Sequence, residues 1–183
     1  MEKIASIKDL EVIKQEYNDK LNKYRYQVLL CGGAGCISSN SIDVKNAVID
    51  EIMQNNLTQD VKFIETGCMG TCAVGPVMLI LPERIYYTEL TPEIARSIIR
   101  SHILKGEILE EHTFYDNSRH KHIPKMEDID FFKEQVKIAL RNCGAMEYDS
   151  INAYIARDGF LAAGKALTLM KPEEIIGEMK TSG

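Results

Sequence analysis

Long hydrophobic runs are missing from this sequence of 183 residues. The longest unbroken apolar run is Val77–Leu81, far short of the roughly 20 residues that a helix needs to cross a bilayer. The N-terminus also lacks the apolar core of a secretory signal peptide, so we expect a cytoplasmic protein without a membrane span. Basic residues are not in excess, because 22 Lys and Arg stand against 27 Asp and Glu for a formal net charge of -5. That balance argues against a nucleic-acid partner.

Catalytic and nucleotide-binding motifs are missing as well. The chain shows no Ser/His/Asp set, no site of paired carboxylates, no glycine-rich phosphate loop and no internal repeat. Its hydrophobic content of 45% is ordinary for a globular protein. The length allows one domain of about 100 residues plus a further, incomplete part. We therefore expect no complete active site in this chain.

Alternating strand and helix patterns predict an α+β fold with a mixed sheet in the first part of the chain. The predicted elements, in chain order, are a helix at 7–22, a strand at 26–30, a helix capped by Ser39 or Ser41, strands at 61–65, 77–81 and 85–87, and a helix capped by Thr91. Residues 105–127 have few apolar side chains and no clear period, which is typical of a linker. Helical patterns follow over 128–142, after Asp149 or Ser150, and after Pro172.

Cysteine placement is the most informative feature of the sequence. Cys31 and Cys36 are spaced C-x4-C, Cys68 and Cys72 are spaced C-x3-C, and each pair follows a predicted strand in a glycine-rich loop. In a reducing compartment, cysteines are more often ligands or redox groups than disulfides. If the two strands are neighbours, both loops leave one edge of the sheet and four thiolates converge. The fifth, Cys143, has no second cysteine nearby, so we expect it to pack as a small apolar residue.

Three kinds of site compete for these four cysteines. A [2Fe-2S] cluster takes four thiolates, and bare glycine backbone can approach it and donate hydrogen bonds to sulfur. Structural zinc sites usually use short C-x2-C knuckles, and neither spacing here is of that kind. Thiol–disulfide chemistry usually shows C-x-x-C at a helix N-terminus, which is absent. The spacing favours the cluster and leaves the other two as alternatives.

The cysteine pattern also resembles a known family. C-x4-C, about 30 residues, and then G-C-x-G-x-C-x-x-G-P resembles the thioredoxin-like [2Fe-2S] ferredoxins. That family includes the small iron–sulfur subunit of NADH dehydrogenase complexes and modules fused to flavoproteins. The resemblance covers residues 24–104. It implies a thioredoxin-like fold and a [2Fe-2S] cluster bound by Cys31, Cys36, Cys68 and Cys72.

A second resemblance concerns the end of the chain. Residues 132–144, 150–160 and 166–176 are similar to the segment that opens the NADH-binding flavoprotein subunit of complex I and of multimeric hydrogenases. In that family a Ser-Gly pair leads into the glycine-rich loop for FMN and NADH, whereas Ser182 and Gly183 end this sequence. No flavin- or NADH-binding residue can therefore be carried over. The predicted organisation is an N-terminal helix at 1–23, a ferredoxin domain at 24–104, a linker at 105–127, and the incomplete helical start of a flavoprotein domain at 128–183.

The function expected from both resemblances is electron transfer. One [2Fe-2S] cluster would relay single electrons within an NAD(P)H-linked oxidoreductase or hydrogenase complex. The expected partners are a flavin- and NADH-binding protein or domain and other iron–sulfur subunits, and the sequence leaves homo-oligomer formation open. The alternatives are a zinc-stabilised interaction module and a thiol oxidoreductase on the same fold.

Overall fold

The computed structural model describes residues 4–183, which form two compact units. The larger unit is Lys23–Tyr148. The smaller unit combines the described residues up to Asn22 with Asp149–Gly183. None of the helices in residues 4–183 is long and apolar enough to cross a membrane.

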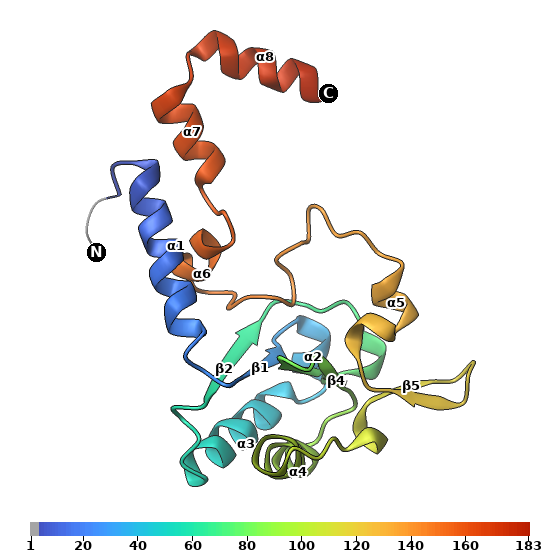
Figure 1. Ribbon diagram of the computed structural model, residues 1–183. Helices are drawn as coiled ribbons and strands as arrows, with labels where there is room; N and C mark the ends of the chain where they lie inside the picture. The colour runs from blue at the N-terminus through green and yellow to red at the C-terminus, as the bar shows by residue number, and fades with distance from the viewer. Residues whose placement is uncertain (1–3) are drawn as a thin grey trace. The chain divides into compact units, whose positions relative to one another are not determined.

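A mixed four-stranded sheet organises the larger unit (Figure 1). Its strands are β1 (Tyr26–Cys31), β2 (Val61–Thr66), β3 (Met78–Leu81) and β4 (Ile85–Tyr87), in the order β2-β1-β3-β4. Strand β1 pairs in parallel with β2 and antiparallel with β3, and β3 pairs antiparallel with β4. The predicted strands and the α+β fold class are confirmed.

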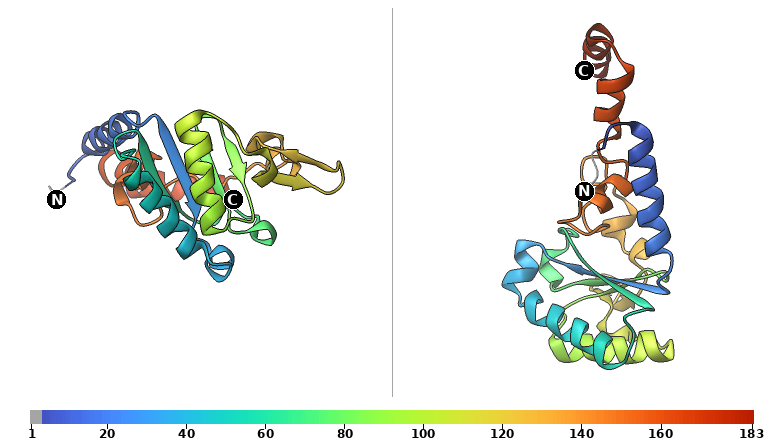
Figure 2. Two further views of the ribbon diagram at one scale, coloured as in Figure 1. Left: turned by 90° about the horizontal axis from the view of Figure 1, so that it is seen from below. Right: turned by 90° about the vertical axis from the view of Figure 1, so that its left-hand side faces the viewer.

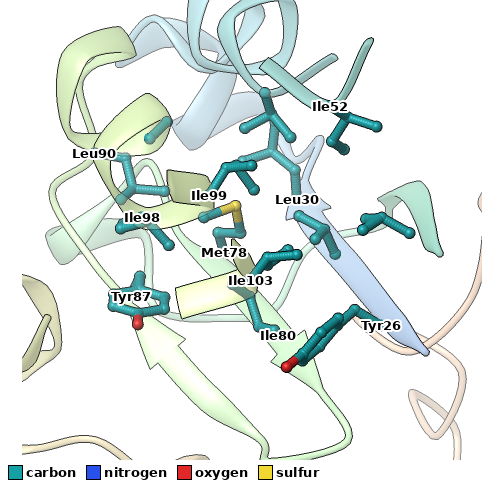
Figure 3. Packing of buried hydrophobic residues seen from close by; sticks show 14 of the residues in the cluster. Tyr26, Leu30, Ile52, Met78, Ile80, Tyr87, Leu90, Ile98, Ile99 and Ile103 are labelled. Carbon is teal, nitrogen blue, oxygen red and sulfur yellow. The ribbon is translucent and has the colours of Figure 1, made fainter. Parts of the chain in front are cut away.

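Two helices cover one face of this sheet. Helix α3 (Ser41–Gln54) and helix α4 (Pro92–Ile98), which continues as the π-helical turn η2 (Ile99–Ile103), lie side by side against it (Figure 2). Alternate strand residues point toward these helices, as the period of two in a strand requires. Figure 3 shows Leu30, Met78 and Ile80 from the strands packed beneath Ile98 and Ile99. This apolar layer fixes the sheet and therefore the loops at its edge.

The same layer contains one buried charge. Glu51 of α3 is 1% exposed. The Arg100 guanidinium donates to both of its carboxylate oxygens at 2.7 and 2.8 Å, and Asn55 Nδ2 donates to Oε1 at 2.7 Å. Arg100, with help from Asn55, lowers the pKa of Glu51 against the opposing effect of burial. A buried carboxylate needs such partners because its desolvation is costly.

The opposite face of the sheet carries a second set of alternating residues. Strand register places Cys31 beside Thr66 and Leu79 beside Tyr86. All four are buried or nearly so. This face, and not the one covered by α3 and α4, therefore carries the first cysteine.

Some local elements differ from those expected. Helix α3 is capped by Asn40, in the left-handed region at φ 72°, and not by Ser39 or Ser41. The glycine-rich turn contains a short helix, α2 (Ala34–Ser38), that the sequence pattern did not predict. The helix expected over 128–142 is present only as η4 (Met126–Asp128) and α5 (Asp130–Lys133). Residues 105–127 hold η3 (Glu110–His112) and a hairpin of β5 (Phe114–Asp116) and β6 (Lys121–Ile123).

The smaller unit is helical. It consists of α1 (Ile7–Leu21), α6 (Ile151–Ala156), α7 (Leu161–Leu169) and α8 (Pro172–Ser182). Ser6 and Asp9 form a capping box at the start of α1, and Ser150 caps α6 as expected. Gly164 lets α7 approach α1 closely, since an added Cβ would lie 3.2 Å from the Ile7 side chain.

Candidate metal centre

The four paired cysteines lie at one edge of the sheet. Cys31 is the last residue of β1, and β2 ends at Thr66, two residues before Cys68. Because β1 and β2 are parallel neighbours, their carboxyl ends meet at that edge, as expected. Cys36 lies on α2, and Cys72 begins the short 3₁₀-helix η1 (Cys72–Val74). Cys31 and Cys36 are buried, whereas Cys68 and Cys72 are exposed.

Contacts between the thiols link the two loops. The Sγ atoms of Cys68 and Cys72 lie 4.0 Å apart. Cys31 interacts with both Cys36 and Cys68, so it connects one pair to the other. Within residues 4–183, no group of three or more His, Cys, Asp or Glu side chains is placed so that it could hold a metal ion. The thiols therefore form a chain of pairwise contacts across the two loops.

The thiols also shift one another's acidity. A hydrogen bond from Cys36, with others from the backbone amides of Gly33 and Met69, lowers the pKa of Cys31 to about 6 despite its burial. The same pairing, with burial, raises the pKa of Cys36 far above its usual range. The pairing thus favours the thiolate, which is the form that binds metals, at Cys31 and the protonated thiol at Cys36. A bound metal ion would displace the Cys36 proton.

The pKa of Cys68 is set by a different balance of effects. The backbone amide of Gly70 lowers its pKa, but burial and the neighbouring sulfurs of Cys72 and Cys31 outweigh that amide and raise it. Negative charge on Cys31 therefore opposes a second thiolate at Cys68. A group that brings positive charge between them would relieve this repulsion.

Glycines leave room for the sulfurs. A Cβ on Gly33 would lie 3.0 Å from Cys68 Cβ and 3.2 Å from Cys68 Sγ. A Cβ on Gly35 would lie 3.1 Å from Cys72 Sγ, and one on Gly75 would lie 3.0 Å from Cys36 Sγ. These distances are shorter than ordinary carbon contacts of about 3.5–4.0 Å. Bare backbone is therefore required where the loops pass the thiols.

The residues between Cys68 and Cys72 are fixed by contacts with the sheet. Thr71 Oγ1 and Tyr86 OH are 2.6 Å apart, so a hydrogen bond ties the loop to the buried face of β4. Met69 is 1% exposed. The loop between the two cysteines is therefore fixed by one buried side chain and one short hydrogen bond.

A further segment packs on this loop, and the sequence did not predict it. We call residues 129–148 the covering segment. Its Phe131 ring lies against the Gly70 backbone, since an added Cβ there would be 3.2 Å from Phe131 Cζ. Its Gly144 lies against Met69, with 3.3 Å from the Cβ position to Met69 Cα. Phe132 packs edge-on against Tyr86, with ring centroids 5.2 Å apart.

The fifth cysteine and two of the histidines lie outside the two paired loops. Cys143 is partly exposed in the covering segment and follows no strand. His122 Nδ1 is 3.1 Å from the Thr113 carbonyl oxygen. His102 is buried in the apolar layer, with its Nδ1 3.0 Å from Tyr87 OH. These histidines have structural partners.

The mixed sheet places two pairs of cysteines in glycine-rich loops at one edge, an arrangement typical of small cysteine-based metal or redox domains. The family model for thioredoxin-like [2Fe-2S] ferredoxins matches residues 13–102. A 2Fe-2S ferredoxin of Clostridium pasteurianum is 32% identical over 75 residues, which are 41% of this chain and 74% of that protein. The chain belongs to the thioredoxin-like [2Fe-2S] ferredoxin family, and its cofactor is a [2Fe-2S] cluster.

The chain is also similar to further proteins. A 2Fe-2S ferredoxin of Aquifex aeolicus is 30% identical over 76 residues, which are 41% of this chain and 68% of that protein. The crystal structure of the wild-type thioredoxin-like [2Fe-2S] ferredoxin from the same organism is 26% identical, covers 49% of this chain and 95% of that chain, and gives a TM-score of 0.45. The NADP-reducing hydrogenase subunit HndC of Solidesulfovibrio fructosivorans is 45% identical over 51 residues, which are 28% of this chain and 10% of that subunit.

The residue types in the two loops suit the cluster chemically. Four cysteine sulfurs are the donor set that a [2Fe-2S] cluster takes, and the glycine cradle keeps side chains away from them. Amides of Gly33, Met69, Gly70 and Val77 donate toward the sulfurs. The chain is accordingly a ferredoxin-like electron carrier.

Proposed function

We propose that Cys31, Cys36, Cys68 and Cys72 bind the cluster, and that the chain relays single electrons within an NAD(P)H-linked oxidoreductase or hydrogenase complex. The observation that carries the ligand assignment is the meeting of the two cysteine loops at the end of the parallel β1–β2 pair. Bound there, the group supplies one-electron chemistry without bond formation to a substrate.

The residues around the thiols suit that role. Buried Cys31 and Cys36 anchor the site on the protein side, and exposed Cys68 and Cys72 leave one side open to a partner. An exposed edge is the side from which an electron can reach a redox partner. Amide donors stabilise the added negative charge of the reduced state and tune its potential. We expect a low potential, because four thiolates meet there with few basic side chains in the two loops.

The proposed complex rests on two similarities to other proteins. It is supported by the similarity to the hydrogenase subunit HndC and by the resemblance of residues 128–183 to the start of a flavoprotein subunit. We propose 24–104 as the ferredoxin domain, 105–127 as the linker and 128–183 as the flavoprotein-like part. The partners would be a flavin- and NADH-binding protein and other iron–sulfur subunits, in the cytoplasm.

Serine substitutions test the ligand assignment. Cys72→Ser and Cys68→Ser replace a soft thiolate donor by a hydroxyl and should lower the iron content and bleach the visible absorption. Cys143→Ser is the matched control, because Cys143 lies outside the paired loops, and it should leave both unchanged. Bleaching by Cys143→Ser would show that the assignment is wrong.

Counting electrons separates the proposed function from thiol chemistry. Coulometric reduction of the anaerobically purified chain should take up one electron per cluster, with no change in the number of titratable thiols. Uptake of two electrons with the appearance of two new thiols would establish a thiol oxidoreductase instead. NADH alone should not reduce the chain. Native mass spectrometry of the complex from its source cells should find a flavin-containing partner, and its absence would contradict the proposed complex.

A further inference from the structure

Thr66, the last residue of β2, carries a polar group that no contact among the described residues explains. Its Oγ1 is a fully buried side-chain oxygen, and within residues 4–183 it has no hydrogen-bond partner. The residue ends β2 and is 0% exposed. Leaving a hydroxyl buried and unsatisfied destabilises a folded protein, so such a group calls for a reason.

Strand register shows where this residue stands. Thr66 pairs with Cys31 across the parallel β1–β2 ladder, so both residues lie on the same face of the sheet, on strands about 4.8 Å apart. That face is opposite to the one covered by α3, where Lys45 pairs with Glu65. The hydroxyl therefore belongs to the side of the sheet on which Cys31 lies.

The protein groups around Thr66 do not use the hydroxyl. Its backbone forms a bridge with Glu147 of the covering segment and accepts from the Gly32 amide at 2.8 Å. Glu147 directs its carboxylate to Lys62 instead, with 3.8 Å between Nζ and Oε1. The backbone of Thr66 is thus fully engaged, while its side chain is shielded from solvent and still has a proton to donate.

We propose that the Thr66 hydroxyl donates a hydrogen bond to an inorganic sulfide of the bound cluster and so tunes the reduction potential. This inference rests on the proposed ligand set. Thr66 would add a side-chain donor to the backbone amides that donate to the cysteine sulfurs. Donors of this kind favour the reduced, more negative state.

Thr66→Val tests the proposal, because valine keeps the shape and removes the hydroxyl. In the reconstituted Thr66→Val protein, the reduction potential should fall, with a reduction equilibrium constant about three- to tenfold smaller than that of the wild type. A tenfold change corresponds to 59 mV for one electron. Thr66→Ser keeps the donor and should hold the wild-type potential. Resonance Raman bands of the iron–sulfur bonds should shift in Thr66→Val and not in Thr66→Ser.

Melting of the protein with and without the cluster gives a second measurement. Without the cluster, Thr66→Val should melt about 2–4 °C above wild type, because it removes an unsatisfied polar atom. With the cluster it should melt at or below wild type. Equal potentials for all three proteins, or a melting shift of the same sign in both forms, would overturn the proposal. A wild-type chain without iron would instead refute the proposed function.

Discussion

Gly33→Ala is the sharpest test of how the loops hold the thiols. Gly33 has φ −67° and ψ 153°, a conformation that alanine adopts without strain. The new methyl would lie 3.0 Å from Cys68 Cβ and 3.2 Å from Cys68 Sγ. The substitution therefore adds a methyl group next to the Cys68 thiol and leaves the backbone conformation unchanged.

The size of the effect follows from these distances. Ordinary contacts begin near 3.4 Å, so Cys68 must give by a few tenths of an ångström to accept the methyl. Metal–ligand distances hold within about 0.2 Å, so a displacement of that size weakens the bond from this sulfur to iron. Cys68 is exposed, which lets the apoprotein yield without a large loss of stability. We expect iron binding to fall below about half of the wild-type value while the fold persists.

The assay is anaerobic reconstitution, followed by iron and sulfide determination and a visible spectrum. Gly67→Ala is the control, because Gly67 precedes Cys68 directly and an added Cβ there meets nothing within 4 Å. It should bind iron as the wild type does. Full iron content and an unchanged spectrum in Gly33→Ala would refute the argument that this close approach positions Cys68.

Two predictions concern the apolar layer. Arg100→Leu leaves the Glu51 carboxylate buried with Asn55 as its main partner, so it should lower the urea midpoint of unfolding. The double variant Glu51→Leu/Arg100→Leu should recover most of that loss, and no recovery would contradict a role for buried charge. Burial lowers the pKa of His102, with Glu83 opposing, so the unfolded chain binds a proton at higher pH than the folded one. The contribution of His102 to the free energy of unfolding is therefore fully present above about pH 6.5, and below that pH it decreases by at most about 1.4 kcal/mol per pH unit. Unfolding curves at two pH values should show a smaller decrease in His102→Gln than in the wild type. An equal decrease would assign the effect to other groups.

The cysteine loops were predictable because their signals are local. Each pair follows a β-prone run and stands among glycines, so the spacing alone places the thiols near strand ends. The parallel pairing of β1 with β2 confirms that both loops leave the same edge. The ligand role of the four cysteines stays a prediction until iron binding is measured.

The covering segment was not predictable in the same way. Phe132, Val136 and Leu140 recur at four-residue steps, which favours a helix with an apolar face. In the structure the helix ends at Lys133, and Val136 and Leu140 are 90% and 62% exposed. Contacts between Gly144 and Met69 join residues far apart in the chain, and no local pattern encodes such a pairing.

Thr66 shows another limit of sequence patterns. A threonine at the end of a strand is ordinary, since β-branched residues favour strands. Its significance comes from complete burial and the lack of a partner among the described residues. Both are properties of the folded chain, so the residue did not stand out before the structure was known.

The chain carries a [2Fe-2S] cluster, and we propose two pairs of cysteines as its ligands. The iron, sulfide and zinc content of the anaerobically purified chain, together with its visible spectrum, tests this directly. We predict a red-brown protein with about two irons and two sulfides per chain. A colourless protein that holds one zinc and no sulfide would contradict it.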